Sequence, residues 1–172
     1  MHRLATADDH SRIIEIERAA GELFRGIGMT DVADDPPISR IAYERFVVDG
    51  GAVVWTADAQ IVAYLLLEEL DGAAHVEQVT VHPGHARAGI GAQLLAAAGS
   101  WAAERGLHAV TLTTFRDVPW NAPYYRRLGF SVFPRAEWGP SLRARMGTEA
   151  ARGLDAWPRV AMIGPTTSRV RA

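Results

Sequence analysis

The sequence predicts a mixed α/β domain in which helices flank one central, mostly antiparallel sheet. The first supporting observation is a run of three apolar segments joined by short turns, which is typical of antiparallel hairpins. The second is the strongest helical pattern, over residues 90–105, which follows the third of these segments. The third is the composition: 48% apolar and 22% charged residues in a chain of 172 suit one globular domain over residues 1–172.

The N-terminal part is expected to be helical. Thr6 or Asp8 caps a helix whose apolar residues recur at helical spacing up to Gly21. Residues 26–38 are rich in turn-forming and acidic residues and are expected to form a long loop. A short helix is expected over residues 39–47.

The rest of the chain alternates between strands and helices. Strands are expected over 53–55, 61–68 and 74–81, with turns at 58–60 and 71–72. The helix over 90–105 is expected to end at Arg105-Gly106. The later elements expected are a strand over 110–113, a short helix from 119 to 129, a strand over 130–133, a peripheral arginine-bearing helix over 139–152 and a strand over 160–162. The tail after residue 165 is expected to fray.

The composition excludes several kinds of chemistry. The chain has no cysteine, so it has no disulfide, no thiolate metal site and no cysteine nucleophile. It also has no lysine, which excludes the lysine of a P-loop and the Schiff base of pyridoxal enzymes. The net charge of −2 argues against nucleic acid as a partner. With no signal peptide and no apolar run long enough to span a bilayer, a cytoplasmic protein without membrane contact is expected.

The turn over residues 87–92, Arg-Ala-Gly-Ile-Gly-Ala, is a candidate anion site. Two glycines between a strand and a helix let the backbone approach a ligand, and the helix N-terminus adds unpaired amides. Arg87 lies where it could pair with a phosphate. The alternative is a tight turn without a ligand. A dinucleotide fingerprint is excluded, because its third glycine would be Leu94.

Two further features suggest proton transfer. Strand alternation puts Glu77 on the same face as Val79 and Val81, where partial desolvation would raise the pKa of its carboxyl and suit it as a general base. The alternative is an edge-strand glutamate whose carboxylate reaches water. Tyr124 and Tyr125 point different ways on a short helix, so one hydroxyl could serve as a proton donor, or both rings could pack in the core.

Together these motifs resemble the GNAT superfamily of acetyl-CoA-dependent N-acetyltransferases. Residues 79–83, the Gly-x-Gly turn and Leu94-Leu95 resemble its coenzyme A motif. Asn121, the tyrosine pair and Leu128-Gly129-Phe130 resemble its second motif. The similarity covers residues 53–133 and departs from the family at Ala86, where Arg or Gln is usual, at Tyr124, where Phe is usual, and at Pro123.

The resemblance implies an enzyme that uses acetyl-CoA and no metal. Tyr125 takes the position of the acid that protonates the coenzyme A thiolate, and Glu77 takes that of the base, acting directly or through water. The cofactor would be bound by Val79, Thr80, Val81, Arg87, Ala88, Gly89, Ile90, Gly91, Ala92 and Asn121. The implied reaction is direct transfer of the acetyl group to a primary amine of a small molecule or a peptide.

The acceptor is less well defined by the sequence. By resemblance, residues 22–38 lie over the open side of the sheet, and Phe24, Met29 and Trp55 are candidate substrate contacts. The acids of this segment could attract a cationic amine or could simply be solvated. Two other functions stay open: a coenzyme A-binding sensor without turnover, and an interaction domain whose glycine turn is only structural. The sequence leaves open whether the chain forms a homodimer.

Overall fold

A computed structural model gives the fold, and it describes residues 1–166. Seven strands follow one another across the sheet in the order β1-β2-β3-β4-β5-β7-β6. Pairings β1–β2, β2–β3, β5–β7 and β6–β7 are antiparallel, whereas β4–β5 is parallel. The strands are β1 (His2–Leu4), β2 (Ala52–Ala57), β3 (Gln60–Leu70), β4 (Ala73–Val81), β5 (Val110–Phe115), β6 (Ser131–Val132) and β7 (Arg159–Gly164). The predicted mixed α/β class with a mostly antiparallel sheet is confirmed.

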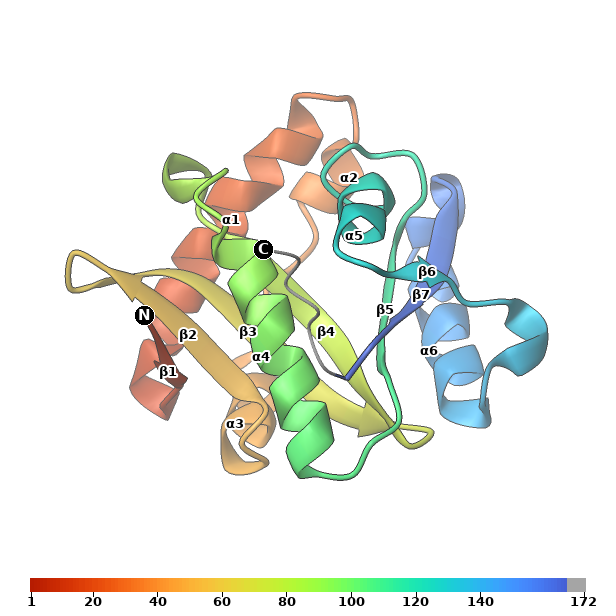
Figure 1. Cartoon of the computed structure of the whole chain (residues 1–172). Helices are drawn as coiled ribbons and strands as arrows, with labels where there is room; N and C mark the ends of the chain where they lie inside the picture. The colour runs from red at the N-terminus through yellow and green to blue at the C-terminus, as the bar shows by residue number, and fades with distance from the viewer. Residues whose placement is uncertain (167–172) are drawn as a thin grey trace. The chain divides into compact units, whose positions relative to one another are not determined.

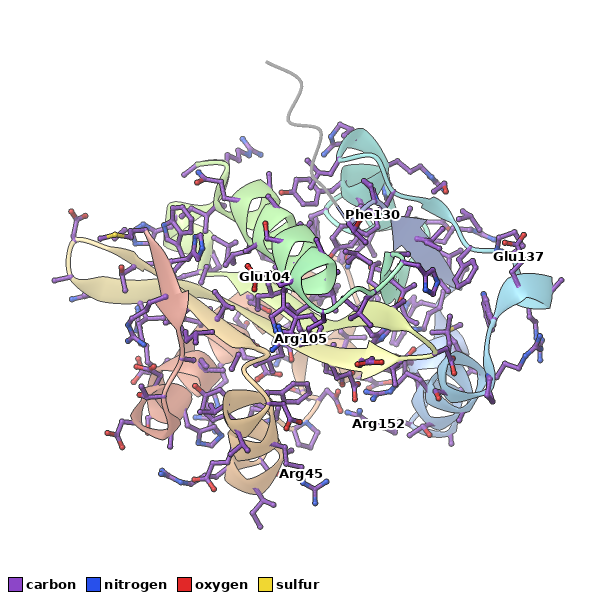
Figure 2. The ribbon with its side chains drawn as sticks, turned by 60° about the horizontal axis from the view of Figure 1, so that its bottom comes forward. Arg45, Glu104, Arg105, Phe130, Glu137 and Arg152 are labelled. Carbon is purple, nitrogen blue, oxygen red and sulfur yellow. The ribbon has the colours of Figure 1, made fainter. Side chains whose placement is uncertain are left out.

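Six α-helices are present in residues 1–166. They are α1 (His10–Arg25), α2 (Thr30–Ala33), α3 (Arg40–Val48), α4 (Ile90–Glu104), α5 (Ala122–Arg127) and α6 (Pro140–Ala151). Every predicted helix corresponds to one of these, and the short α2 was not predicted. Helix α4 ends as expected, with Gly106 in the left-handed conformation (φ 68°). Arg105, labelled beside Glu104 in Figure 2, places its guanidinium 3.9 Å from the ring centroid of Trp101.

The chain divides into two compact units. The first comprises Met1–Glu68 and Gln78–Leu95, and the second comprises Glu69–Glu77 and the chain from Ala96 onward. The boundary crosses β4 and α4, so each of these elements contributes residues to both units.

The first unit has a core built from α1, α3 and the strands β2 and β3. In Figure 1, α1 lies behind β2 and β3. Ile13 and Ile16 of α1 are fully buried, and the hydroxyl of buried Tyr43 in α3 donates a hydrogen bond to the carbonyl oxygen of Thr6 (2.8 Å). The buried core residues are Ala5, Ile13, Ile16, Tyr43, Ala52, Val54, Tyr64 and Leu66.

The second unit is organised around β5, which pairs with β7 from Val110 to Phe115. The turn predicted at residues 71–72 is present, and it has a further role. The carboxylate of Asp71 accepts hydrogen bonds from the amides of Ser141 (3.1 Å) and Leu142 (2.9 Å) at the start of α6. These amides have no partner inside the helix, so Asp71 caps α6 from a distant part of the sequence.

Three local predictions differ from the structure. The segment predicted as a loop contains α2, and β1 was not predicted because its residues are exposed and lack an apolar pattern. Gly21 was predicted to end the first helix, but α1 continues to Arg25. A Cβ atom at Gly21 would lie 3.2 Å from the carbonyl oxygen of Ala33, so this glycine allows α2 to approach α1 closely.

Candidate active site

The turn between β4 and α4 has the backbone geometry of an anion-binding turn. Residues 86–89 are exposed, and Arg87 and Gly89 both adopt the left-handed conformation, with φ of 63° and 74°. Where residues in the left-handed conformation alternate with residues in the right-handed conformation, successive backbone N–H groups point to one side of the chain. The first-turn amides of α4, beginning at Ile90, have no partner inside their helix.

The side chains around this turn leave its outer surface accessible. Ala88 is exposed, Ile90 is buried with 6% of its surface exposed, and Gly91 and Ala92 belong to the first turn of α4. Arg87 is also exposed, and it forms no ion pair with residues 1–166. Its guanidinium is therefore available to a negatively charged ligand.

The strand before the turn carries Val79, Thr80 and Val81, all half-buried. The parallel ladder pairs Ala74–Val76 of β4 with Val110–Leu112 of β5. Val79, Thr80 and Val81 lie beyond the end of that ladder. Their backbone groups are thus candidates for pairing with an extended ligand.

Glu77 has a charged partner that the sequence did not predict. Sequence alternation predicted a carboxylate partly desolvated among valines. In the structure, 30% of the Glu77 side chain is exposed, and its carboxylate is hydrogen-bonded and ion-paired with Arg145 of α6, whose side chain is 26% exposed. Strand alternation could not predict this partner, because it describes one strand, whereas the charge pair joins residues 68 positions apart.

Helix α5 places Asn121 and Tyr125 on the same turn, where the amide of Tyr125 donates to the carbonyl oxygen of Asn121 (3.0 Å). The side-chain nitrogen of Asn121 donates to the hydroxyl of Thr114 in β5 (2.8 Å), and its Oδ1 atom is buried without a hydrogen-bond partner in residues 1–166. A buried acceptor of this kind usually has a partner. An N–H donor of a ligand would supply one.

Tyr125 is buried, with 8% of its surface exposed, and its ring packs against Tyr124 and Phe130. Its hydroxyl forms no hydrogen bond within the described part of the chain. Burial raises the pKa of Tyr125 far above its ordinary value, and the neighbouring Tyr124 adds to this effect. The hydroxyl therefore stays protonated at neutral pH and can donate a hydrogen bond.

The three candidate substrate contacts lie in different surroundings. Phe24 is half-buried at the end of α1, and its carbonyl oxygen accepts a hydrogen bond from the amide of Met29 (3.0 Å), whose side chain is buried. Trp55 is half-buried in β2, with its ring centroid 6.0 Å from that of His2. In the acidic segment, Asp34 is exposed and paired with Arg25 (2.5 Å).

A model described as "Acetyltransferase (GNAT) family" matches residues 14–130. The chain belongs to this family. The match covers the turn over residues 86–92 as well as Asn121 and Tyr125. The two motifs that carried the resemblance therefore both lie inside the family region of this GNAT chain.

Solved structures share the fold of this GNAT protein at low sequence identity. A PaiA N-acetyltransferase from Thermoplasma acidophilum, in complex with coenzyme A, has a TM-score of 0.70 at 16% identity, with 96% of this chain and 98% of that chain covered. A ribosomal-protein-alanine N-acetyltransferase from Brucella melitensis has a TM-score of 0.67 at 16% identity, with 96% and 99% covered. N-acetylglutamate synthase from Neisseria gonorrhoeae, with coenzyme A and N-acetyl-glutamate, gives 0.71 at 16% identity, with 95% of this chain and 34% of that chain covered.

One polar residue of this GNAT chain was missed as a site residue by sequence reasoning. Glu17 of α1 has a half-buried carboxylate that accepts hydrogen bonds from Gln78 Nε2 (3.1 Å) and the amide of Ile38 (3.4 Å). Burial is the main cause that raises its pKa. The available signal was a glutamate next to the buried Ile13 and Ile16 on an amphipathic helix.

Two kinds of feature are absent from residues 1–166. Residues 1–166 contain no cluster of histidine and carboxylate side chains able to hold a metal ion. No helix in that range is long and apolar enough to cross a membrane.

Proposed function

We propose that this chain is an N-acetyltransferase that uses acetyl-CoA and transfers the acetyl group directly to a primary amine. The observation that carries the proposal is Tyr125, a buried tyrosine whose protonated hydroxyl has no hydrogen-bond partner in residues 1–166. A protein that only bound coenzyme A would not need a proton donor at this position.

The turn over residues 86–92 supports binding of the pyrophosphate. The turn offers N–H donors from its left-handed residues and from the first-turn amides of α4. The unpaired Arg87 adds positive charge for the same anion. Val79 and Val81 would pair with the pantetheine arm through their backbone groups, as the family resemblance implies. The family usually has Arg or Gln at the position of Ala86, and Arg87 would replace that side chain.

Asn121 fits a role beside the same cofactor. Its buried Oδ1 atom accepts no hydrogen bond, while its side-chain nitrogen donates to the hydroxyl of Thr114. Pantetheine contains amide N–H groups that could donate to Oδ1. The orphaned atom therefore fits the cofactor that the family implies.

Acetyl-CoA supplies a thioester, an acyl group activated for attack by a neutral amine. Glu77 would accept the proton that the amine loses, directly or through water, and Tyr125 would donate its proton to the thiolate sulfur. The ion pair with Arg145 holds the carboxylate of Glu77 in place. Because the chain has no cysteine, transfer through an acyl-cysteine is excluded and direct transfer is favoured.

The acceptor class is a primary amine of a small molecule or a peptide. Both kinds occur in the names of the structural neighbours, which include a ribosomal-protein-alanine N-acetyltransferase and an N-acetylglutamate synthase. The second candidate function is a coenzyme A-binding sensor without turnover, which the unpaired Arg87 and the orphaned Asn121 would serve equally well.

Two measurements test the proposal. Acetyl-CoA should raise the melting temperature of the wild-type chain, and the increase should be smaller for Arg87→Ala. Thiol release measured with a panel of primary amines should then exceed release without amine. If acetyl-CoA stabilises the fold and no amine releases thiol, the sensor is the correct function. If acetyl-CoA has no effect, neither function holds.

A further inference from the structure

Helix α6 is held in the second unit by polar contacts more than by apolar burial. The described residues 140–151 include one buried side chain, that of Leu142. Hydrogen bonds and ion pairs hold the start, the middle and the end of the helix. These interactions depend on distance and direction, so they define the position of a helix more narrowly than apolar contacts do.

The start of α6 is held by Asp71, in the turn between β3 and β4. The two oxygens of its carboxylate accept hydrogen bonds from the amides of Ser141 (3.1 Å) and Leu142 (2.9 Å). Gly139, just before the helix, lies against the same carboxylate: a Cβ atom there would be 2.3 Å from Asp71 Cγ. The contact therefore needs a carboxylate at position 71 and the absence of a side chain at position 139.

The end of α6 is held by Glu149, whose side chain is 13% exposed. Its carboxylate accepts hydrogen bonds from the hydroxyl of Thr113 in β5 (2.7 Å) and from Nη2 of Arg159 in β7 (2.8 Å). The Arg159 side chain is 10% exposed. Separating so shielded a pair would leave a charge with little water around it, so this end of the helix is also fixed.

Arg145 lies between these two contacts, one turn after Leu142 and one turn before Glu149, and it is ion-paired with Glu77 of β4. His75 of β4 lies near the same guanidinium, because the charge of Arg145 contributes to lowering the pKa of His75. Burial is the larger cause, and the pKa falls to about 3. His75 is therefore uncharged at neutral pH and does not compete with Arg145 for Glu77.

We propose that Asp71 is a positioning residue for acetyl transfer: by fixing the start of α6, it holds Arg145 against Glu77. This inference rests on the proposed function, in which Glu77 accepts the proton of the amine. A neighbouring cation favours the charged form of a carboxylate, so a well-placed Arg145 keeps Glu77 ready to accept that proton. Without the cap, the first turn of α6 loses the partners of two amides, and Arg145 lies in the next turn.

Asp71→Gly removes the carboxylate and keeps the turn, because Asp71 has a φ of 51°, which glycine adopts readily. Asp58→Gly is the matched control. Asp58 has a φ of 49° in the turn between β2 and β3, and its side chain forms no hydrogen bond within residues 1–166. Asp71→Asn keeps an oxygen that can cap the helix and should behave like wild type.

The first measurement is the titration of the Glu77 carboxylate by ¹³C NMR, with Glu77→Gln identifying its signal. The titration midpoint should move to higher pH in Asp71→Gly by about 0.5–1 unit, part of the effect of a neighbouring cation. It should stay in place in Asp58→Gly and Asp71→Asn. An unmoved midpoint in Asp71→Gly, together with a lower melting temperature, would overturn the proposal, because Asp71 would then only stabilise α6.

Gly139→Ala tests the same contact from the other side. Its Cβ atom should displace the Asp71 carboxylate and move the Glu77 midpoint in the same direction. In the Asp71→Gly background, the same substitution meets no carboxylate and should add nothing. Additive effects of the two substitutions would show that Gly139 does not act through Asp71, and would overturn the proposal.

Kinetics give a further test with a primary amine that releases thiol. The acidic limb of the pH–rate profile should move to higher pH in Asp71→Gly without changing its shape. Below that limb, kcat should fall by about three- to ten-fold, the factor that corresponds to the same shift. The KM for acetyl-CoA should stay near wild type. A loss of stability alone would reduce the amount of active enzyme and leave the limb in place, which would contradict the proposal.

The NMR titration needs no turnover, so it separates this proposal from the proposed function. A moved midpoint in a chain that releases no thiol with any amine would overturn the proposed function and support the coupling of Asp71 to Glu77. Thiol release with an unmoved midpoint would support the proposed function and overturn the role of Asp71.

Discussion

Tyr125 and Tyr64 are two buried tyrosines with different surroundings. Burial raises the pKa of both hydroxyls, so both stay protonated at neutral pH. Tyr125 lies on α5 beside Tyr124 and has no carboxylate among the groups that shift its pKa, whereas Tyr64 is close to Glu17. The first hydroxyl is the proposed hydrogen-bond donor to the coenzyme A thiolate, whereas the second is buried beside a carboxylate of its own chain.

Replacing Tyr125 by Phe should lower turnover by about 10²–10⁴, the usual contribution of a positioned proton donor. The affinity for acetyl-CoA, measured by calorimetry, should change little because the ring is kept. Tyr124→Phe is the matched control and should retain near wild-type turnover. If Tyr125→Phe also retains it, Tyr125 has no part in the reaction.

Replacing Glu77 by Gln should lower the rate at neutral pH, with partial recovery at alkaline pH, where the free amine is more abundant. Arg145→Gln separates proton acceptance from a structural role, because it breaks the same ion pair and keeps the carboxylate. The pH–rate profile of Glu77→Gln should change its shape, whereas that of Arg145→Gln should keep it. Identical profiles for the two variants would show that only the ion pair matters.

At the scale of elements, glycines mark the places where two segments approach each other closely. Gly21 lets α2 approach α1, as described above. Gly51, before β2, lies against β3: a Cβ atom there would be 2.0 Å from the carbonyl oxygen of Leu67, whose amide donates to the carbonyl oxygen of Gly51 (2.8 Å). Any side chain at this position must separate the two segments or distort them.

Gly51→Ala should therefore lower the free energy of unfolding by several kcal/mol, at the upper end of the usual range for single substitutions. Gly147→Ala is the opposite case, since Gly147 lies within α6 and a Cβ atom there meets nothing within 4 Å. It should raise the free energy of unfolding by about 0.5–1 kcal/mol, because alanine has the higher helix propensity. Urea unfolding of the two variants should give changes of opposite sign, and equal signs would contradict the close approach at Gly51.

At the scale of the whole molecule, the half-buried carboxylate of Glu17 makes stability depend on pH. The folded-state pKa of Glu17 is raised, mainly by burial and also by Asp35, while Gln78 and the amide of Ile38 oppose the shift. The stabilising contribution of the protonated group is then fully present below the unfolded-state pKa and is lost as the pH rises through the folded-state pKa. At neutral pH, this carboxylate lowers the stability of the fold.

Glu17→Gln should consequently be more stable than wild type at neutral pH, since glutamine keeps an oxygen that can accept from Gln78 and carries no charge. The difference should vanish below the usual glutamate pKa of about 4.3. Chemical unfolding of wild type and variant at several pH values measures the stability difference at neutral pH and its loss at low pH. Equal stability of wild type and variant at neutral pH would show that Glu17 is not held in an unfavourable environment.

The sequence by itself determined the features that are encoded locally. Periodicity predicted α4 and the strands β2 to β5, because apolar spacing directly reflects which face of an element is buried. The glycine turn and the Asn121–Phe130 motif were sufficient to indicate the family before any fold was known. β1 was missed because an exposed strand of three residues is held by backbone hydrogen bonds, which leave no side-chain pattern.

Only the tertiary structure decided the environment of each charged or hydroxyl group. The pairing of Glu77 with Arg145, the capping of α6 by Asp71, and the neutral partners of Glu17 all join residues tens of positions apart. Burial and charge at a given atom are sums over neighbours that folding brings together from the whole chain. A periodic pattern describes one element and contains no information about what packs against it.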